Sequence, residues 1–119
     1  MHHTFENQPR FFYIGKDAQG VKDLHYGELY KEHLLQIPIK YQDIDNSWDL
    51  IFALNDELSL LIDIDESEVI ASEKLQKALE IAERVIAKEP NSTKAESMSV
   101  FLSAIKTAIS YHSPLLIWW

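Results

Sequence analysis

Residues 72–111 read SEKLQKALEIAERVIAKEPNSTKAESMSVFLSAIKTAISY, and their apolar residues recur every three or four positions. This spacing predicts two amphipathic helices. The first should begin at Ser72 and end near Lys88, because Pro90 disfavours the helical conformation for the residue before it. The second should begin at Thr93, whose hydroxyl starts a capping box. Since only about four residues separate the two helices, they should pack as an antiparallel hairpin.

Each helix should bury one stripe of apolar side chains and expose the opposite face. In the first helix the stripe consists of Leu75, Ala78, Leu79, Ala82, Val85 and Ile86. In the second helix it consists of Met98, Phe101, Leu102, Ile105, Ala108 and Ile109. Such stripes need a second layer, which a sheet can provide.

On the N-terminal side of these helices, apolar and polar residues alternate, which is typical of half-buried strands. The clearest case is a hairpin in which residues 48–54 and 57–65 are strands joined by a tight turn of Asn55 and Asp56. Ile51 and the acidic residues would then face solvent. The inner face would carry eight core residues: Trp48, Leu50, Phe52, Leu54, Leu58, Leu60, Ile62 and Ile64.

Three further segments complete the expected sheet. Residues 11–14 form an aromatic strand that Gly15 ends, and residues 17–20 have the composition of a turn. Residues 35–41 should form an edge strand, because Pro38 cannot donate a hydrogen bond to a neighbour. The chain closes with the apolar run 115–119, which we interpret as a buried strand. The alternative for Trp118 and Trp119 is an exposed aromatic anchor for a partner.

Residues 24–34 suit two structures. Their apolar and aromatic residues fit one face of a helix, but Gly27 weakens a helix, and we therefore favour a strand. Taken together, the patterns predict one α+β domain over residues 1–119. It should contain an antiparallel sheet of about four to six strands, with the helix hairpin on one face and a final short strand.

The composition narrows the class of protein. The chain has 119 residues, 46% of them hydrophobic, and no cysteine. Disulfides, thiolate zinc sites and cysteine nucleophiles are therefore excluded, and a reducing compartment such as the cytoplasm is expected. We find no secretory signal and no apolar run of the roughly 20 residues that span a bilayer. The net charge of −8 disfavours nucleic acid as a ligand, because such ligands require stripes of Lys and Arg.

The negative charge is concentrated in one window, residues 43–68, which holds nine acidic residues and no Lys, Arg or His. The rest of the chain has ten acidic residues and eleven Lys and Arg. A local block of one sign accelerates encounter with a partner of opposite charge. The window therefore predicts a basic protein partner. The candidate contact residues are Asp43, Asp45, Asp49, Asp56, Glu57, Asp63, Asp65, Glu66 and Glu68, with Trp48 as an apolar anchor if it lies outside the core.

No residue pattern predicts an enzyme, a metal centre or a cofactor site. The segments 43–45 and 63–65 each place two carboxylates two residues apart, which could hold Mg²⁺ or Ca²⁺. A calcium loop starting at Asp43 fails, because Trp48 stands where the sharp turn requires glycine. His25, His33 and His112 have no nucleophile or acid at a spacing that would pair them for catalysis.

In its small size, its lack of cysteine and its acidic window, the chain resembles the immunity proteins of bacterial toxin systems, including those of contact-dependent growth inhibition. The resemblance implies a cytoplasmic protein that occupies the basic active-site cleft of a cognate nuclease toxin. The window 43–68 would then be the surface that enters the cleft.

Two other classes of function fit the sequence. A secretion chaperone is also small, acidic and α+β, and would require exposed apolar grooves. A ligand-binding or enzymatic domain would require an aromatic pocket, for which the candidates are Phe11, Tyr13, Tyr26 and Tyr41.

Overall fold

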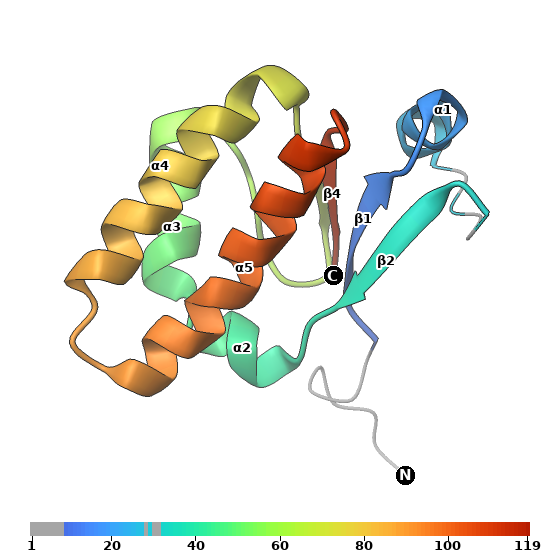
Figure 1. Cartoon of the computed structure of the whole chain (residues 1–119). Helices are drawn as coiled ribbons and strands as arrows, with labels where there is room; N and C mark the ends of the chain where they lie inside the picture. The colour runs from blue at the N-terminus through green and yellow to red at the C-terminus, as the bar shows by residue number, and fades with distance from the viewer. Residues whose placement is uncertain (1–8, 28, 30–31) are drawn as a thin grey trace, which may run out of the picture.

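A sheet of four antiparallel strands forms the centre of the computed structural model, which describes residues 9–27, 29 and 32–119 (Figure 1). In space the strands run in the order β2-β1-β4-β3. Their bounds are Phe11–Gly15 for β1, Leu34–Pro38 for β2, Ser67–Ile70 for β3 and Leu115–Trp118 for β4. The C-terminal strand is therefore internal, between β1 and β3, as expected for the apolar run that forms it.

Helices cover both faces of this sheet. In Figure 1 the layer of α3, α4 and α5 lies on one side and α1 lies on the other. The helices are α1 (Ala18–Tyr26), α2 (Tyr41–Asp45), α3 (Trp48–Leu58), α4 (Ser72–Lys88) and α5 (Ser92–Ser110). The α+β class predicted from the sequence is confirmed, with four strands in the sheet. Within the described part of the chain, no helix is long and apolar enough to cross a membrane.

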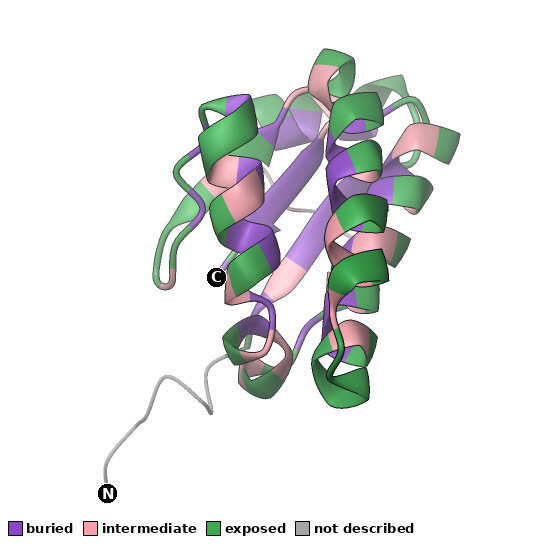
Figure 2. Ribbon diagram, turned by 90° about the vertical axis from the view of Figure 1, so that its left-hand side faces the viewer, coloured by how far each residue is buried: buried purple, intermediate pink, exposed green. Residues whose placement is uncertain are grey.

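Alternation along the strands divides the core into two parts. Phe12, Ile14 and Ile117 pack with the α3–α5 layer, whereas Tyr13 and Leu116 point to the opposite side. There Leu24 of α1 and Leu34 of β2 complete a smaller cluster. Figure 2 shows buried residues along the strands and on the inward sides of the helices, with exposed residues outward.

The helix hairpin is confirmed, with α4 ending at Lys88 as Pro90 predicts. The caps differ from expectation: Ala71, not Ser72, is the N-cap residue of α4. For α5 the N-cap is Asn91 rather than Thr93, because the Asn91 side chain accepts a hydrogen bond from the Lys94 amide at 3.0 Å. Asparagine is among the preferred N-cap residues.

The stripes of the two helices were predicted with small errors. Ile81 and Ala104, which the sequence analysis left out, are fully buried. Both helices also have predicted stripe residues that are only partly buried: Leu79, Val85, Ile86, Leu102 and Ile109. The stripes are rotated because α4 and α5 pack both against each other and against neighbouring elements.

Residues 48–58 form α3 instead of the first strand and the turn of a hairpin, and residues 59–65, expected in its second strand, lie in a loop, so that prediction was wrong. A segment this rich in apolar residues fits the period of two and the period of 3.6. Packing against α4 favours the helix. The helix ends at Ser59, which takes a left-handed φ of 56°. One buried face of α3 carries four residues at helical spacing: Leu50, Ile51, Leu54 and Leu58.

The change from strand to helix reverses the predicted burial of two side chains. Phe52, expected in the core, is 62% exposed, and Ile51, expected to face solvent, is fully buried. Trp48 and Ile64 are partly buried. The other five predicted core residues are buried as expected: Leu50, Leu54, Leu58, Leu60 and Ile62.

The strand favoured for residues 24–34 is also a correction. The segment begins inside α1, and Gly27 ends that helix in the left-handed conformation with φ 72°. The glycine that argued against a helix is thus its C-terminal stop. Residues 28, 30 and 31 lie outside the described residues.

Residues 17–20, expected to form a turn, begin α1, because Asp17 caps it by accepting from the Gly20 amide at 2.8 Å. The edge strand is confirmed as β2, although Tyr41 begins α2 instead of continuing that strand.

Candidate functional site

The acidic window 43–68 follows a path over four elements. Asp43 and Asp45 lie on α2, and Asp49, Asp56 and Glu57 lie on α3. Asp63, Asp65 and Glu66 lie in the loop 59–66, and Glu68 lies on β3. Most of these acids were predicted to lie on a strand hairpin. The helix of residues 48–58 replaces that arrangement.

Three of the nine acids hold the fold together. The Asp43 carboxylate accepts a hydrogen bond from Oγ of the buried Ser97 at 2.9 Å, which ties α2 to α5. Glu57 forms an ion pair with Arg84 of α4. Glu68 accepts hydrogen bonds from two backbone amides at 2.7 and 2.9 Å. These three carboxylates are already engaged within the chain.

Five other acids of the window are exposed and have no hydrogen-bond or ion-pair partner among the described residues. We call this group the surface acids: Asp45, Asp49, Asp56, Asp65 and Glu66. The remaining carboxylate, Asp63, is also exposed and accepts a hydrogen bond from the amide of Ile64. The surface acids are therefore the members of the window whose charge is available to a partner.

The Asn55 side chain holds the acidic loop against α3. Its amide nitrogen donates to the Ile62 carbonyl at 3.0 Å, and its carbonyl oxygen accepts from the Ile62 amide at 2.8 Å. The paired bonds fix Ile62 beside the helix, and the Leu60 amide donates to the Asn55 backbone carbonyl at 3.1 Å. Asn55, predicted to form the tip of a hairpin, thus positions the loop that carries Asp65 and Glu66.

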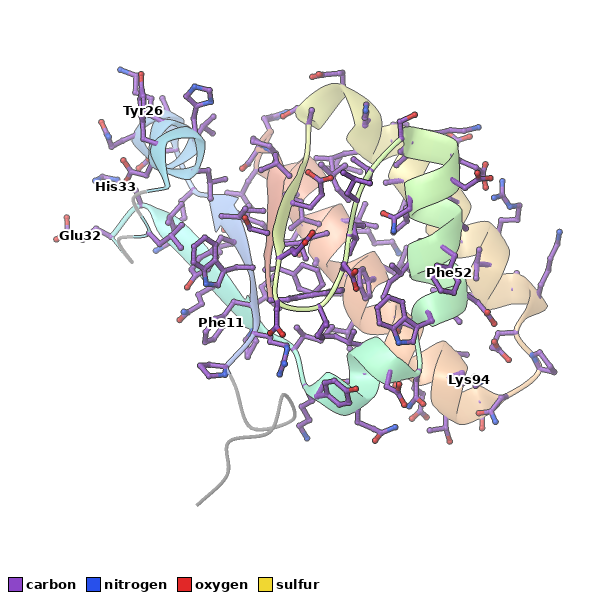
Figure 3. All side chains as sticks on the ribbon, turned by 180° about the vertical axis from the view of Figure 1, so that it is seen from behind. Phe11, Tyr26, Glu32, His33, Phe52 and Lys94 are labelled. Carbon is purple, nitrogen blue, oxygen red and sulfur yellow. The ribbon has the colours of Figure 1, made fainter. Side chains whose placement is uncertain are left out.

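An aromatic pair stands among the surface acids on α3. Phe52 projects outward from the helix (Figure 3), and its ring centroid lies 5.6 Å from that of Trp48. Both rings were predicted in the core, and only Trp48 was given a second role, as an anchor if it lies outside the core. The helical spacing of the four buried residues of α3 is the sequence signal that would have placed Phe52 on the surface.

Cations border the acidic surface on one side. Asp49 lines an open hollow of about 350 Å³ together with Lys88, Lys94 and one further acid, Glu89, at the connection between α4 and α5. No ion pair within 4 Å joins them in the described part of the chain. The positive charge of these lysines therefore offsets the field of Asp49 more than that of Asp56, which lies two turns along α3.

Contrary to expectation, the two carboxylate pairs considered as cation sites do not lie on strands. Asp43 and Asp45 lie on α2, where Asp43 is bound to Ser97. Asp63 and Asp65 lie in the loop, where Asp65 takes a left-handed φ of 61°. Over the described ranges 9–27, 29 and 32–119, no group of three or more possible ligands gathers.

One histidine has a carboxylate partner, on the α1 side of the molecule. His33 Nδ1 lies 2.9 Å from Asp17 Oδ2, which joins the start of β2 to the N-terminus of α1. The hydrogen bond with Asp17 raises the pKa of His33. In return, the hydrogen bonds from His33 and from the Gly20 amide lower the pKa of Asp17.

We expect this pair to make stability depend on pH. Because the folded-state pKa of His33 is raised, its stabilising effect is fully present below the unfolded pKa and is lost as pH rises through the folded pKa. The lowered pKa of Asp17 acts at the acidic end, where stability is lost as pH falls through the folded value. The pair is exposed, so the change should be small.

An NMR titration of the His33 ring would check this prediction. Its midpoint should lie above the ordinary value of 6.5. Asp17→Asn should return the midpoint toward that value, while the asparagine still caps α1. Equal midpoints in the two proteins would contradict the prediction.

The four residues proposed for an aromatic pocket lie on three elements. The rings of Phe11 and Tyr13 are neighbours on β1, at 5.8 Å. Tyr26 is 73% exposed on α1, and Tyr41 of α2 lies under the guanidinium of Arg10 at 5.3 Å.

A different hollow, of about 280 Å³ and largely apolar, opens between α1 and the β3–β4 side of the sheet. It is lined by Val21, Leu24, His25, Val69 and Pro114. The sequence did not predict that these residues meet in one hollow, because they come from three distant segments.

Comparison of the chain with protein families, with characterised proteins and with solved structures finds no match.

Proposed function

We propose that this protein binds and neutralises a basic macromolecular partner, and that it is an immunity protein which blocks the active site of a cognate bacterial nuclease toxin. The observation that carries the proposal is the group of surface acids on α2, α3 and the loop 59–66. These carboxylates are exposed and have no partner among the described residues. Concentrated charge of one sign destabilises the isolated protein by self-repulsion, and it attracts an oppositely charged partner.

The mechanism is occupation of a cationic cleft. A nuclease holds phosphates with Lys and Arg, and those side chains remain in place when the substrate is absent. Carboxylates that enter the cleft replace the phosphates and exclude RNA or DNA. Close charge pairs between two proteins have coupling energies of about 1.5–7 kcal/mol, so a few suffice for a tight complex.

The helix and the fixed loop favour this mechanism. Asp49 and Asp56 project from a rigid element that α4 supports. Asn55 holds the loop that carries Asp65 and Glu66. Charges fixed before binding lose little conformational entropy when the complex forms.

A secretion chaperone is the second candidate, and the apolar hollow between α1 and β3 favours it. Val69 and Trp118, two exposed residues of the same sheet, are 41% and 43% exposed. An unfolded effector could place apolar side chains there. The two candidate surfaces adjoin where Trp118 lines an open hollow with Asp65 and Glu66. The two candidates differ in the partner, which is a folded nuclease in one case and an unfolded secreted protein in the other.

The product of the gene directly upstream is the partner to test. We expect this protein to abolish nucleic-acid cleavage by that product at a one-to-one ratio. We also expect the association rate to fall at least about tenfold between about 0.1 and 1 M NaCl. The Debye length shrinks from about 10 to about 3 Å over that range, which screens the steering field. Stopped-flow association and a cleavage assay measure the two effects.

Cleavage by the nuclease alone at each salt concentration is the control, since nucleic-acid binding itself weakens with salt. Full cleavage in the presence of excess protein would reject the immunity function. An association rate that does not change with salt would reject the acidic surface as the steering element.

A further inference from the structure

The exposed face of α3 has an aromatic ring at its centre with carboxylates beside it. Residues three and four positions apart on a helix are neighbours, with Cβ atoms about 5–6 Å apart. The neighbours of Phe52 in these positions include Trp48, Asp49 and Asp56. Asp49 and Asp56 are both exposed, and Phe52 is 62% exposed. Figure 3 shows Phe52 on the outer side of α3. A cation that approaches Phe52 therefore finds an exposed ring with a carboxylate about one turn away in each direction along the helix.

We propose that this face of α3 binds arginine side chains of the basic partner, with a guanidinium stacked on Phe52 and hydrogen-bonded to Asp49 or Asp56. This inference rests on the proposed function and specifies the chemistry of the partner's contact residues. A guanidinium is planar and weakly hydrated, stacks on aromatic rings and binds carboxylates through two parallel hydrogen bonds. A lysine ammonium is compact and strongly hydrated, so it gains less from the ring.

The position of the aromatic pair fits this role. Trp48 is partly buried against the core and its ring lies at 31° to that of Phe52, so it supports Phe52 from one side. A ring restrained in this way loses little freedom when a second group stacks on it. Tryptophan, tyrosine and arginine are the side chains most enriched in the strongest contacts of protein interfaces, and phenylalanine is enriched in interfaces in general.

Charge complementarity favours a basic occupant over three others: an apolar segment, a lipid surface and a second copy of this chain. An apolar segment or a lipid surface would bury Asp49 and Asp56 without a partner, which is costly. A second copy of this chain, related by a twofold axis, would bring the same acidic face against itself. Like charges opposed across an interface cost several kcal/mol. A segment rich in arginine can stack on the aromatic ring and pair with the carboxylates.

Two peptides of equal charge, nona-arginine and nona-lysine, test the inference by NMR titration of the protein at low salt. We expect nona-arginine to bind about two- to fivefold more tightly, the ratio that corresponds to an exposed cation–π contact. The largest amide shifts should lie within α3 (Trp48–Leu58). Phe52→Leu keeps an apolar side chain without the ring, and should reduce nona-arginine binding to the nona-lysine level.

Tyr26→Leu is the matched control, because Tyr26 is a more exposed ring on α1, outside the acidic window. It should leave the preference for arginine unchanged. Equal affinity of the two peptides for the unaltered protein, or amide shifts confined to other elements, would overturn the arginine inference and leave the basic partner in place. Failure of both peptides to bind would overturn the acidic surface, and with it both proposals.

Discussion

Replacing Trp119 with alanine is expected to lower the free energy of unfolding by about 3–5 kcal/mol, the range for removing a large buried aromatic side chain. Trp119 is 8% exposed, and its ring meets Phe12 and Phe101 edge to face at centroid distances of 6.2 and 5.5 Å. The cavity would lie where β1, α5 and the C-terminal strand meet. Chemical denaturation measures the loss.

Trp118→Ala is the matched control. Trp118 is the sequence neighbour of Trp119, but it points to the other side of the sheet and is 43% exposed. We expect it to cost far less. Trp119→Phe should also cost less than alanine. It keeps an aromatic ring and removes Nε1, which is buried and has no hydrogen-bond partner among the described residues. Equal losses for Trp118→Ala and Trp119→Ala would contradict the assignment of core and surface.

The sequence predicted the elements that carry their own strong periodicity. The helices α4 and α5 have 17 and 19 residues, long enough for the helical repeat to exclude the strand repeat. The strand β1 is short but ends in glycine, and the apolar C-terminal run left few alternatives to an internal strand. The α+β class followed from these elements, because two amphipathic helices need a second layer.

The errors lie where local patterns are ambiguous and tertiary packing decides. The helix α3 has only 11 residues, and its apolar residues fit both periods. Packing on α4 selects the helix, and this choice exchanges Ile51 and Phe52 between core and surface. In α1, Gly27 argued against a helix when placed inside the segment but stabilises the end of one when placed after it.

The acidic window was visible in the sequence. The sequence did not show which of its carboxylates are bound within the chain and which are available to a partner. Ser97 lies 54 positions from Asp43, and Arg84 lies 27 positions from Glu57. No local sequence pattern predicts pairings between residues so far apart in the chain. The structure therefore adds the distinction between carboxylates that hold the fold and the surface acids, and this distinction separates the effects of mutation on binding and on folding.

Neutralising three surface acids together, Asp45→Asn, Asp49→Asn and Asp56→Asn, is expected to weaken the complex with the upstream gene product by about 2–5 kcal/mol. That is the cost of leaving interfacial cations buried without their partners. Stability should change little or rise, because these carboxylates repel one another in the free protein. Within α3, Asp49 lies in the first turn, where the helix dipole favours it, and Asp56 lies near the end, where it is disfavoured, so these two effects oppose each other.

Asp43→Ala is the control with the opposite expectation. The buried Ser97 would lose the carboxylate that accepts its hydroxyl hydrogen bond, at a cost of about 1–3 kcal/mol of stability. Affinity should be retained, because Asp43 is engaged within the chain. Thermal melts and affinity measurements give the stability and the affinity of each of the two variants. Unfolding of the triple variant, or its full affinity for the partner, would contradict a contact surface formed by the acids of α2 and α3. A loss of affinity in Asp43→Ala without a loss of stability would move Asp43 from the group that holds the fold to the group that binds.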